Sequence, residues 1–111
     1  MVRKAELGEL EHLVLLAALR LESDAYAPAI AGLLEEHAGR ELSRGTLYAA
    51  LDRLESRGLL TWSIAAASPA QTGHRRRRFR VTRAGVEVLR ASRQALFGLW
   101  HGLEHRLGEQ D

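Results

Sequence analysis

Cysteine is absent from the 111-residue sequence, which excludes both a disulfide framework and a thiolate metal site. Long apolar runs are also missing, because the purest one, residues 13–19, is too short for a bilayer-crossing helix of about 20 residues. Near the amino terminus, Arg3 and Lys4 are followed by glutamates rather than by the apolar core of a signal sequence. We therefore expect one compact cytoplasmic domain.

Patterns typical of enzymes are scarce as well. No Gly-rich phosphate-binding loop occurs, and Ser43 and Ser92 have no recognisable base and acid partners for nucleophilic catalysis. His101 and His105 stand four residues apart in a helical pattern and could share a metal, but no third ligand is evident. We therefore expect no enzyme, no cofactor and no metal site, with both histidines exposed on a helix.

Charge, by contrast, is distributed unevenly along the chain. The net charge is only +2, yet five basic residues fall within residues 75–80. Such a patch suits a polyanion, because neutralised phosphates release counterions; a solvated charged loop is the alternative. Only 5% of the residues are aromatic, and no stacking platform for RNA is apparent, so DNA is the favoured polyanion.

Apolar periodicity predicts the elements. Three- and four-residue spacings indicate helices over four ranges: 5–21, 26–37, 43–57 and 83–107. Before the last helix, Leu60, Trp62 and Ile64 alternate as in a strand with one buried face, and Phe79 and Val81 lie in the returning strand. The predicted fold class is therefore mainly α with a small β-hairpin.

Residues typical of helix ends support these ranges. Pro28 fits the first turn of the second helix, and Gly39 is expected to end it. Ser43 is suited to the N-cap of the third helix, and Gly58 to a left-handed C-cap. Thr82 is expected to cap the last helix.

Three segments together match a family pattern. Residues 42–60 read LSRGTLYAALDRLESRGLL, with a Gly-Thr-Leu-Tyr step, an Arg-Leu-Glu and an Arg-Gly-Leu. An Arg-rich stretch ends in Phe-Arg-Val-Thr at residues 79–82 and continues into Arg-Ala-Gly, and residues 7–16 read LGELEHLVLL. In this order the segments resemble the PadR family over about residues 7–95.

The resemblance implies a bacterial homodimeric repressor, often responsive to a small molecule. Its fold would be a winged helix-turn-helix, residues 1–82, followed by a C-terminal dimerisation helix, residues 83–111. One departure is Asp-Ala-Tyr at residues 24–26, where the family commonly has Gly before the Tyr. This change affects the turn before the second helix and not the DNA-binding face.

The order of elements is itself that of a winged helix-turn-helix, whose third helix enters the major groove and whose hairpin, the wing, contacts the backbone or minor groove. Asp52 would repel phosphate, so we expect only the first half of the third helix, 43–57, to enter deeply. The candidate contacts on this helix are Ser43, Arg44, Gly45, Thr46, Tyr48 and Arg53. Tyr48 has the alternative of packing beneath the wing.

The wing, about residues 62–81, supplies the phosphate candidates His74, Arg75, Arg76 and Arg77. Strand parity places Arg75 and Arg77 on the same side as Phe79. Arg78 and Arg80 should instead point outward with Arg76.

The last helix carries an apolar stripe of Leu89, Leu96, Trp100, Leu103 and Leu107. So small a domain cannot cover a stripe this long, so we predict that two copies pair through it. Trp100 either lines a pocket for a small aromatic effector between the paired helices or simply anchors the interface.

The predicted function is sequence-specific binding of double-stranded DNA by a homodimeric transcriptional repressor. The alternative is a winged-helix adaptor that docks other proteins without reading DNA. Loss of the basic wing would favour the adaptor, and this chain keeps the wing.

Overall fold

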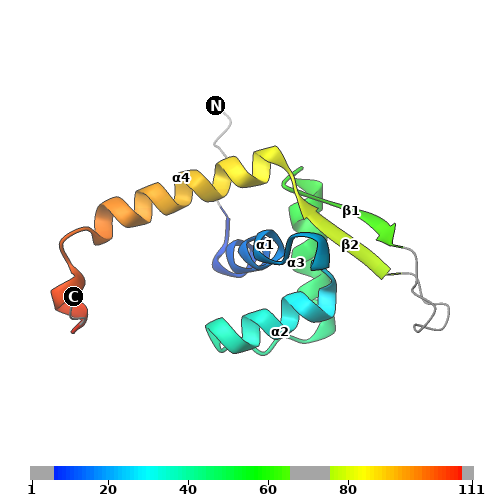
Figure 1. Cartoon of the computed structure of the whole chain (residues 1–111), viewed down its shortest axis with the longest axis horizontal. Helices are drawn as coiled ribbons and strands as arrows, with labels where there is room; N and C mark the ends of the chain where they lie inside the picture. Colours follow the sequence, from blue (N-terminus) through cyan, green and yellow to red (C-terminus); the bar gives the residue numbers. More distant parts are fainter. Residues whose placement is uncertain (1–6, 66–75, 109–111) are drawn as a thin grey trace.

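The computed structural model describes residues 7–65 and 76–108 as a helical body, a hairpin and a projecting helix (Figure 1). The elements are α1 (Glu9–Leu21), the 3-10 turn η1 (Glu22–Asp24), α2 (Ala27–Ala38), α3 (Arg44–Ser56), β1 (Leu60–Ala65), β2 (Arg76–Val81), α4 (Arg83–Trp100) and the 3-10 turn η2 (Glu104–Leu107). This arrangement confirms the predicted fold class. No helix among these residues is long and apolar enough to span a bilayer.

The core forms where α1 lies against α2, α3 and β2. Its largest fully buried side chains come from every one of these elements and from β1: Val14, Leu15, Ile30, Leu51, Leu54, Leu60 and Phe79. The start of α1 was predicted too early, because the helix begins at Glu9 with Gly8 as its N-cap. The Gly8 N–H donates to Glu11 Oε1 at 3.0 Å, which fixes this end.

The predicted helix ends in the middle of the chain are confirmed. Gly39 is the left-handed C-cap of α2, and Ser43 Oγ accepts the Thr46 N–H at 3.1 Å at the start of α3. Gly58 has φ +74° just after α3, and the next residue, Leu59, turns back into the core. Thr82 caps α4 by accepting the Gly85 N–H at 3.1 Å.

The two strands pair antiparallel, with Leu60 opposite Val81, Trp62 opposite Phe79 and Ile64 opposite Arg77. Leu60 and Phe79 are buried as predicted. Ile64 was expected on the buried face but is 47% exposed, because the hairpin extends beyond the core at this point.

The hairpin has a further backbone partner that the sequence did not indicate. The Phe79 N–H donates to the Ala25 carbonyl at 2.8 Å, and Tyr26 forms an antiparallel bridge with Arg78. The connection between α1 and α2 therefore lies along the free edge of β2 and ties the hairpin to the helical body.

The end of α4 differs from the prediction. The helix ends at Trp100 rather than at residue 107, and Gly102 adopts φ +87°, which L side chains rarely adopt. Leu103 therefore lies just before η2 and Leu107 lies within it, so neither residue is on the apolar stripe of α4. His101 is the C-cap of α4, so His101 and His105 do not share a helical face as expected.

The first half of α4 packs on α1, and its second half projects away from the body (Figure 1). Leu89 is only 6% exposed and belongs to the core of the single chain. Its assignment to a dimer interface was therefore wrong. Ser92 Oγ lies 3.4 Å from His12 Nδ1 and marks the end of this contact with α1.

Candidate nucleic-acid interface

The amino-terminal half of α3 is open to solvent. Arg44, Gly45 and Thr46 are exposed, and apart from the adjoining backbone of α3 itself no atom lies within 4 Å of where a Gly45 side chain would begin. The Ser43 hydroxyl lies 2.8 Å from Thr46 Oγ1 and also holds the first turn through the Thr46 N–H. The four residues thus form a fixed, uncovered helix start with backbone N–H groups available to an anion.

Tyr48 of α3 and Trp62 of β1 both lie next to Arg77 of the wing. Both side chains are half-buried and pack on the core. The Arg77 guanidinium carbon lies 4.6 Å from the centre of the Trp62 ring and 5.8 Å from that of Tyr48. Tyr48 therefore packs beneath the wing, the alternative that the sequence left open, while remaining next to the exposed face of α3.

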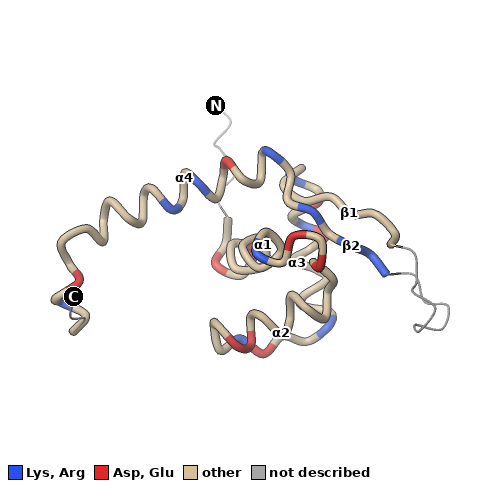
Figure 2. Tube along the Cα trace, in the orientation of Figure 1, with Lys and Arg blue, Asp and Glu red and all other residues tan. Residues whose placement is uncertain are grey.

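The arginines of β2 divide between the two faces of the hairpin as strand parity predicts. Arg77 shares the face of Phe79, and Arg76, Arg78 and Arg80 are exposed on the other. Figure 2 shows this concentration of positive charge along β2. The Arg76 guanidinium carbon also lies 5.8 Å from the centre of the Tyr26 ring.

Two of the wing candidates, His74 and Arg75, lie outside the described residues. Arg76 and Arg77 are therefore the wing candidates that the structure can place. They stand at the start of β2, at the end of the described hairpin away from the core, on opposite faces of the strand and next to different aromatic rings.

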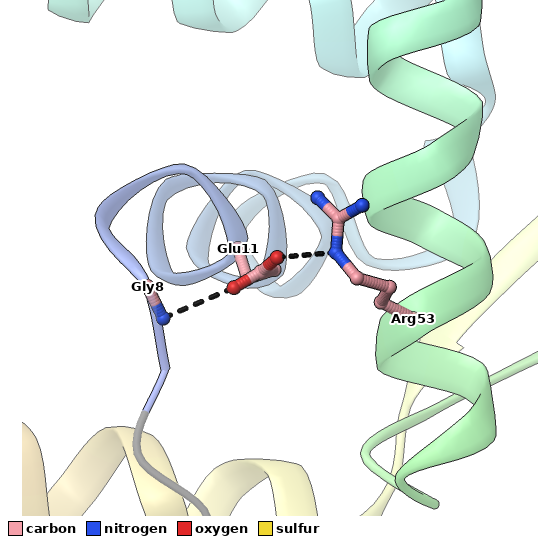
Figure 3. Close-up of polar contacts among 3 residues, drawn as sticks. All are labelled: Gly8, Glu11 and Arg53. Atoms are coloured by element: carbon pink, nitrogen blue, oxygen red, sulfur yellow. Dashed lines mark hydrogen bonds and ion pairs between the residues drawn. The ribbon is translucent and has the colours of Figure 1, made fainter.

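Arg53 forms an ion pair with α1. Its Nε donates to Glu11 Oε2 at 2.5 Å, on the side of α3 that faces α1 (Figure 3). Glu11 also accepts from Gly8, so one carboxylate joins the start of α1 to the second half of α3. Arg53 therefore helps to hold α3 against α1, and its contact with DNA stays a prediction.

The Glu11 carboxyl has a lowered pKa. The Arg53 hydrogen bond lowers it most, partial burial opposes this, and the Gly8 N–H and the charge of Arg57 lower it further. A carboxyl whose pKa is lower in the folded state stabilises the fold above its unfolded pKa, about 4.3. This contribution is lost as the pH falls through the lowered folded pKa.

The variant Glu11→Gln is therefore expected to have a smaller free energy of unfolding at pH 7, by up to about 1 kcal/mol for a partly exposed pair. The difference from the wild type should shrink below about pH 4, since protonation removes the pair from the wild type as well. Urea unfolding at several pH values measures this. Glu55→Gln, at an exposed position on α3, is the control. A deficit that stays constant at all pH values would contradict the assignment.

A second exposed surface is apolar and is formed by side chains of the part of the chain that projects from the body. Its members are Leu96, Phe97, Leu99, Trp100, Leu103 and Leu107, each 43–74% exposed. Phe97 and Leu99 were missed from the sequence, although Leu99 stands three residues after Leu96, a spacing that places both on one side of a helix. We call this set the C-terminal apolar surface.

Three helices followed by a two-stranded wing define the winged helix-turn-helix class. The family profile of the transcriptional regulator PadR-like family matches residues 15–91, and the chain belongs to that family. The family consists of transcriptional regulators, which confirms that the chain is not an enzyme.

Solved structures agree with this placement. A PadR family regulator from Eggerthella lenta is 31% identical with TM-score 0.62, covering 93% of this chain and 88% of that one. A PadR-like transcription factor from Bacteroides fragilis is 27% identical with TM-score 0.71, covering 86% and 87%. Bacillus subtilis PadR, solved in complex with operator DNA, is 18% identical with TM-score 0.63, covering 75% and 46%. No curated protein matches the chain.

Proposed function

We propose that the chain is a repressor that binds double-stranded operator DNA in a sequence-specific manner as a homodimer. The observation that carries this proposal is the placement of Arg77 between Trp62 of the wing and Tyr48 of α3. Through this contact the basic wing and α3, with its exposed start, form one surface. The Bacillus subtilis PadR structure, with the same fold bound to operator DNA, supports it.

In this proposal the first half of α3 enters the major groove. Arg44 and Thr46 reach base edges or phosphates, and Gly45 allows the helix backbone to approach closely. Ser43 holds the helix start, which favours a phosphate at its N–H groups. Arg76 and Arg77 of the wing contact the backbone and fix the orientation of the protein on the duplex.

The variant Arg44→Ala should weaken binding to the selected operator by about 1–3 kcal/mol if the side chain reaches a base. The thermal midpoint should stay nearly unchanged, because Arg44 is exposed and makes no ion pair with any described residue. Fluorescence anisotropy of a labelled duplex measures the affinity. The control is Arg20→Ala, which removes an exposed charge beside α2. Equal affinities of Arg44→Ala and wild type would contradict the assignment.

Homodimer formation is proposed from the C-terminal apolar surface. Soluble monomers rarely expose so many neighbouring large apolar side chains, and pairing of two copies would cover them. Trp100 is 46% exposed within this surface, which favours its role as an interface anchor. An aromatic effector beside Trp100 stays a prediction.

The adaptor alternative makes a different prediction. A winged-helix adaptor would pair through the same C-terminal apolar surface but would not bind DNA. A dimer without affinity for any duplex at low salt would therefore favour the adaptor, while salt-dependent binding to mixed-sequence DNA would oppose it.

A further inference from the structure

Arg77 occupies a corner between two elements that are separate in the sequence. It lies on β2, opposite Ile64 of β1, and its guanidinium lies against Trp62 of β1 and Tyr48 of α3. Arg77 is exposed, whereas the two rings are half-buried and packed on the core. The planar cation is therefore supported from below by two fixed rings while it remains open to solvent.

No carboxylate neutralises this cation within the described part of the chain, because Arg77 forms no ion pair there. A guanidinium that stacks on aromatic faces keeps the N–H groups at its edge free to donate. Because the rings limit its rotation, less side-chain entropy is lost when those groups bind a partner. Two oxygens of a phosphate can accept two parallel N–H bonds from one guanidinium.

The position of Arg77 indicates which phosphate. Arg77 belongs to the wing and Tyr48 beside it belongs to α3, so DNA bound to both elements would pass its backbone over this corner. On the proposed DNA-binding function, we propose that Arg77 is a preorganised seat for one backbone phosphate between the grooves contacted by α3 and the wing. Tyr48 and Trp62 are positioning residues that act through Arg77.

The seat requires an arginine and not merely a positive charge. Lysine carries a compact ammonium that neither stacks in this way nor offers a planar fork. Arg77→Lys should therefore weaken binding to a mixed-sequence duplex on the order of tenfold. Its slope of log K against log salt should stay close to that of the wild type, because lysine keeps the charge. Arg77→Gln should weaken binding at least as much and should reduce this slope by about 0.9, the value for one phosphate contact.

The control is Arg80→Lys, on the same strand and exposed, with no ring contact among the described residues. It should leave affinity and salt slope as in the wild type. If Arg77→Lys binds like the wild type while Arg77→Gln does not, charge alone matters and the seat is overturned. If neither variant changes binding, Arg77 touches no phosphate. A wild type that binds no duplex would instead overturn the proposed function itself.

The positioning role of Tyr48 has its own test. Tyr48→Phe keeps the ring and should bind like the wild type, whereas Tyr48→Leu removes the ring and should weaken binding as Arg77→Lys does. Tyr48→Leu should add nothing in an Arg77→Gln background, because both changes remove the same contact. Additive effects, or weakened binding by Tyr48→Phe, would show that Tyr48 contacts DNA directly and would overturn its role through Arg77. Thermal unfolding of each variant identifies any loss of folded protein.

Discussion

The double variant Leu96→Asp, Leu99→Asp is expected to be monomeric and to lose tight DNA binding. The two side chains are 48% and 74% exposed in the single chain, so their replacement leaves the core intact. In a paired surface each buried leucine contributes about 1.5–3 kcal/mol, and a carboxylate there would have to be desolvated. A two-fold symmetric interface contains each substituted residue twice, so we expect the interface to be lost rather than weakened.

Sedimentation at tens of micromolar protein, where the wild type should be a dimer, measures the association. Gln94→Asp, an exposed change in charge on α4 at a spacing that does not share the face of Leu96 and Leu99, is the matched control and should stay dimeric. Circular dichroism of the double variant should retain the helical signal, because the winged-helix part is unchanged. A double variant that remains a dimer, or a monomeric wild type, would show that α4 does not form the interface.

The second large effect is expected at Gly85, where α4 begins against the hairpin. A Cβ at this position would lie 2.3 Å from the Leu59 carbonyl oxygen and 2.7 Å from Val81 Cγ1. The first atom belongs to the backbone, so relief of the clash requires the whole start of α4 to move. Gly85→Ala should therefore destabilise the fold by about 2–3 kcal/mol, even though alanine favours helix by about 1 kcal/mol.

Thermal unfolding measures this change, and the midpoint should fall by about 10 °C or more. Gly32→Ala is the matched control, because Gly32 lies within α2 with no atom within 4 Å of the added Cβ. That variant should be stabilised by up to about 1 kcal/mol. An unfolding midpoint of Gly85→Ala at or above that of the wild type would contradict the close packing of α4 on the hairpin.

Local features of the fold could be predicted because they depend on a few adjacent residues. The caps at Ser43 and Thr82 each need only one side chain and one N–H three residues away. The end of α4 was missed because Gly98 and Gly102 both interrupt the same apolar pattern. Gly98 stays within the helix, and Gly102 turns out of it. Periodicity does not distinguish these two outcomes.

The other features that could not be predicted depend on contacts between residues far apart in the sequence. An apolar stripe shows which side of a helix is covered but not by what, so Leu89 was assigned to a second copy although the core of the single chain buries it. Arg53 and Glu11 are 42 residues apart, and no local pattern indicates that they meet. Strand parity correctly placed Arg77 on the side of Phe79, but only the fold places Tyr48 beside it.

Selection of bound fragments from the source genome by the purified wild-type chain tests the central claim most directly. We predict enrichment of an inverted repeat whose half-sites lie about one DNA turn apart, roughly 10 base pairs, because each copy would place one α3 in successive major grooves. The same fragments should be lost with Arg44→Ala and with the Leu96→Asp, Leu99→Asp variant. Failure to enrich any sequence above random fragments, or enrichment of a single unrepeated half-site, would contradict the account.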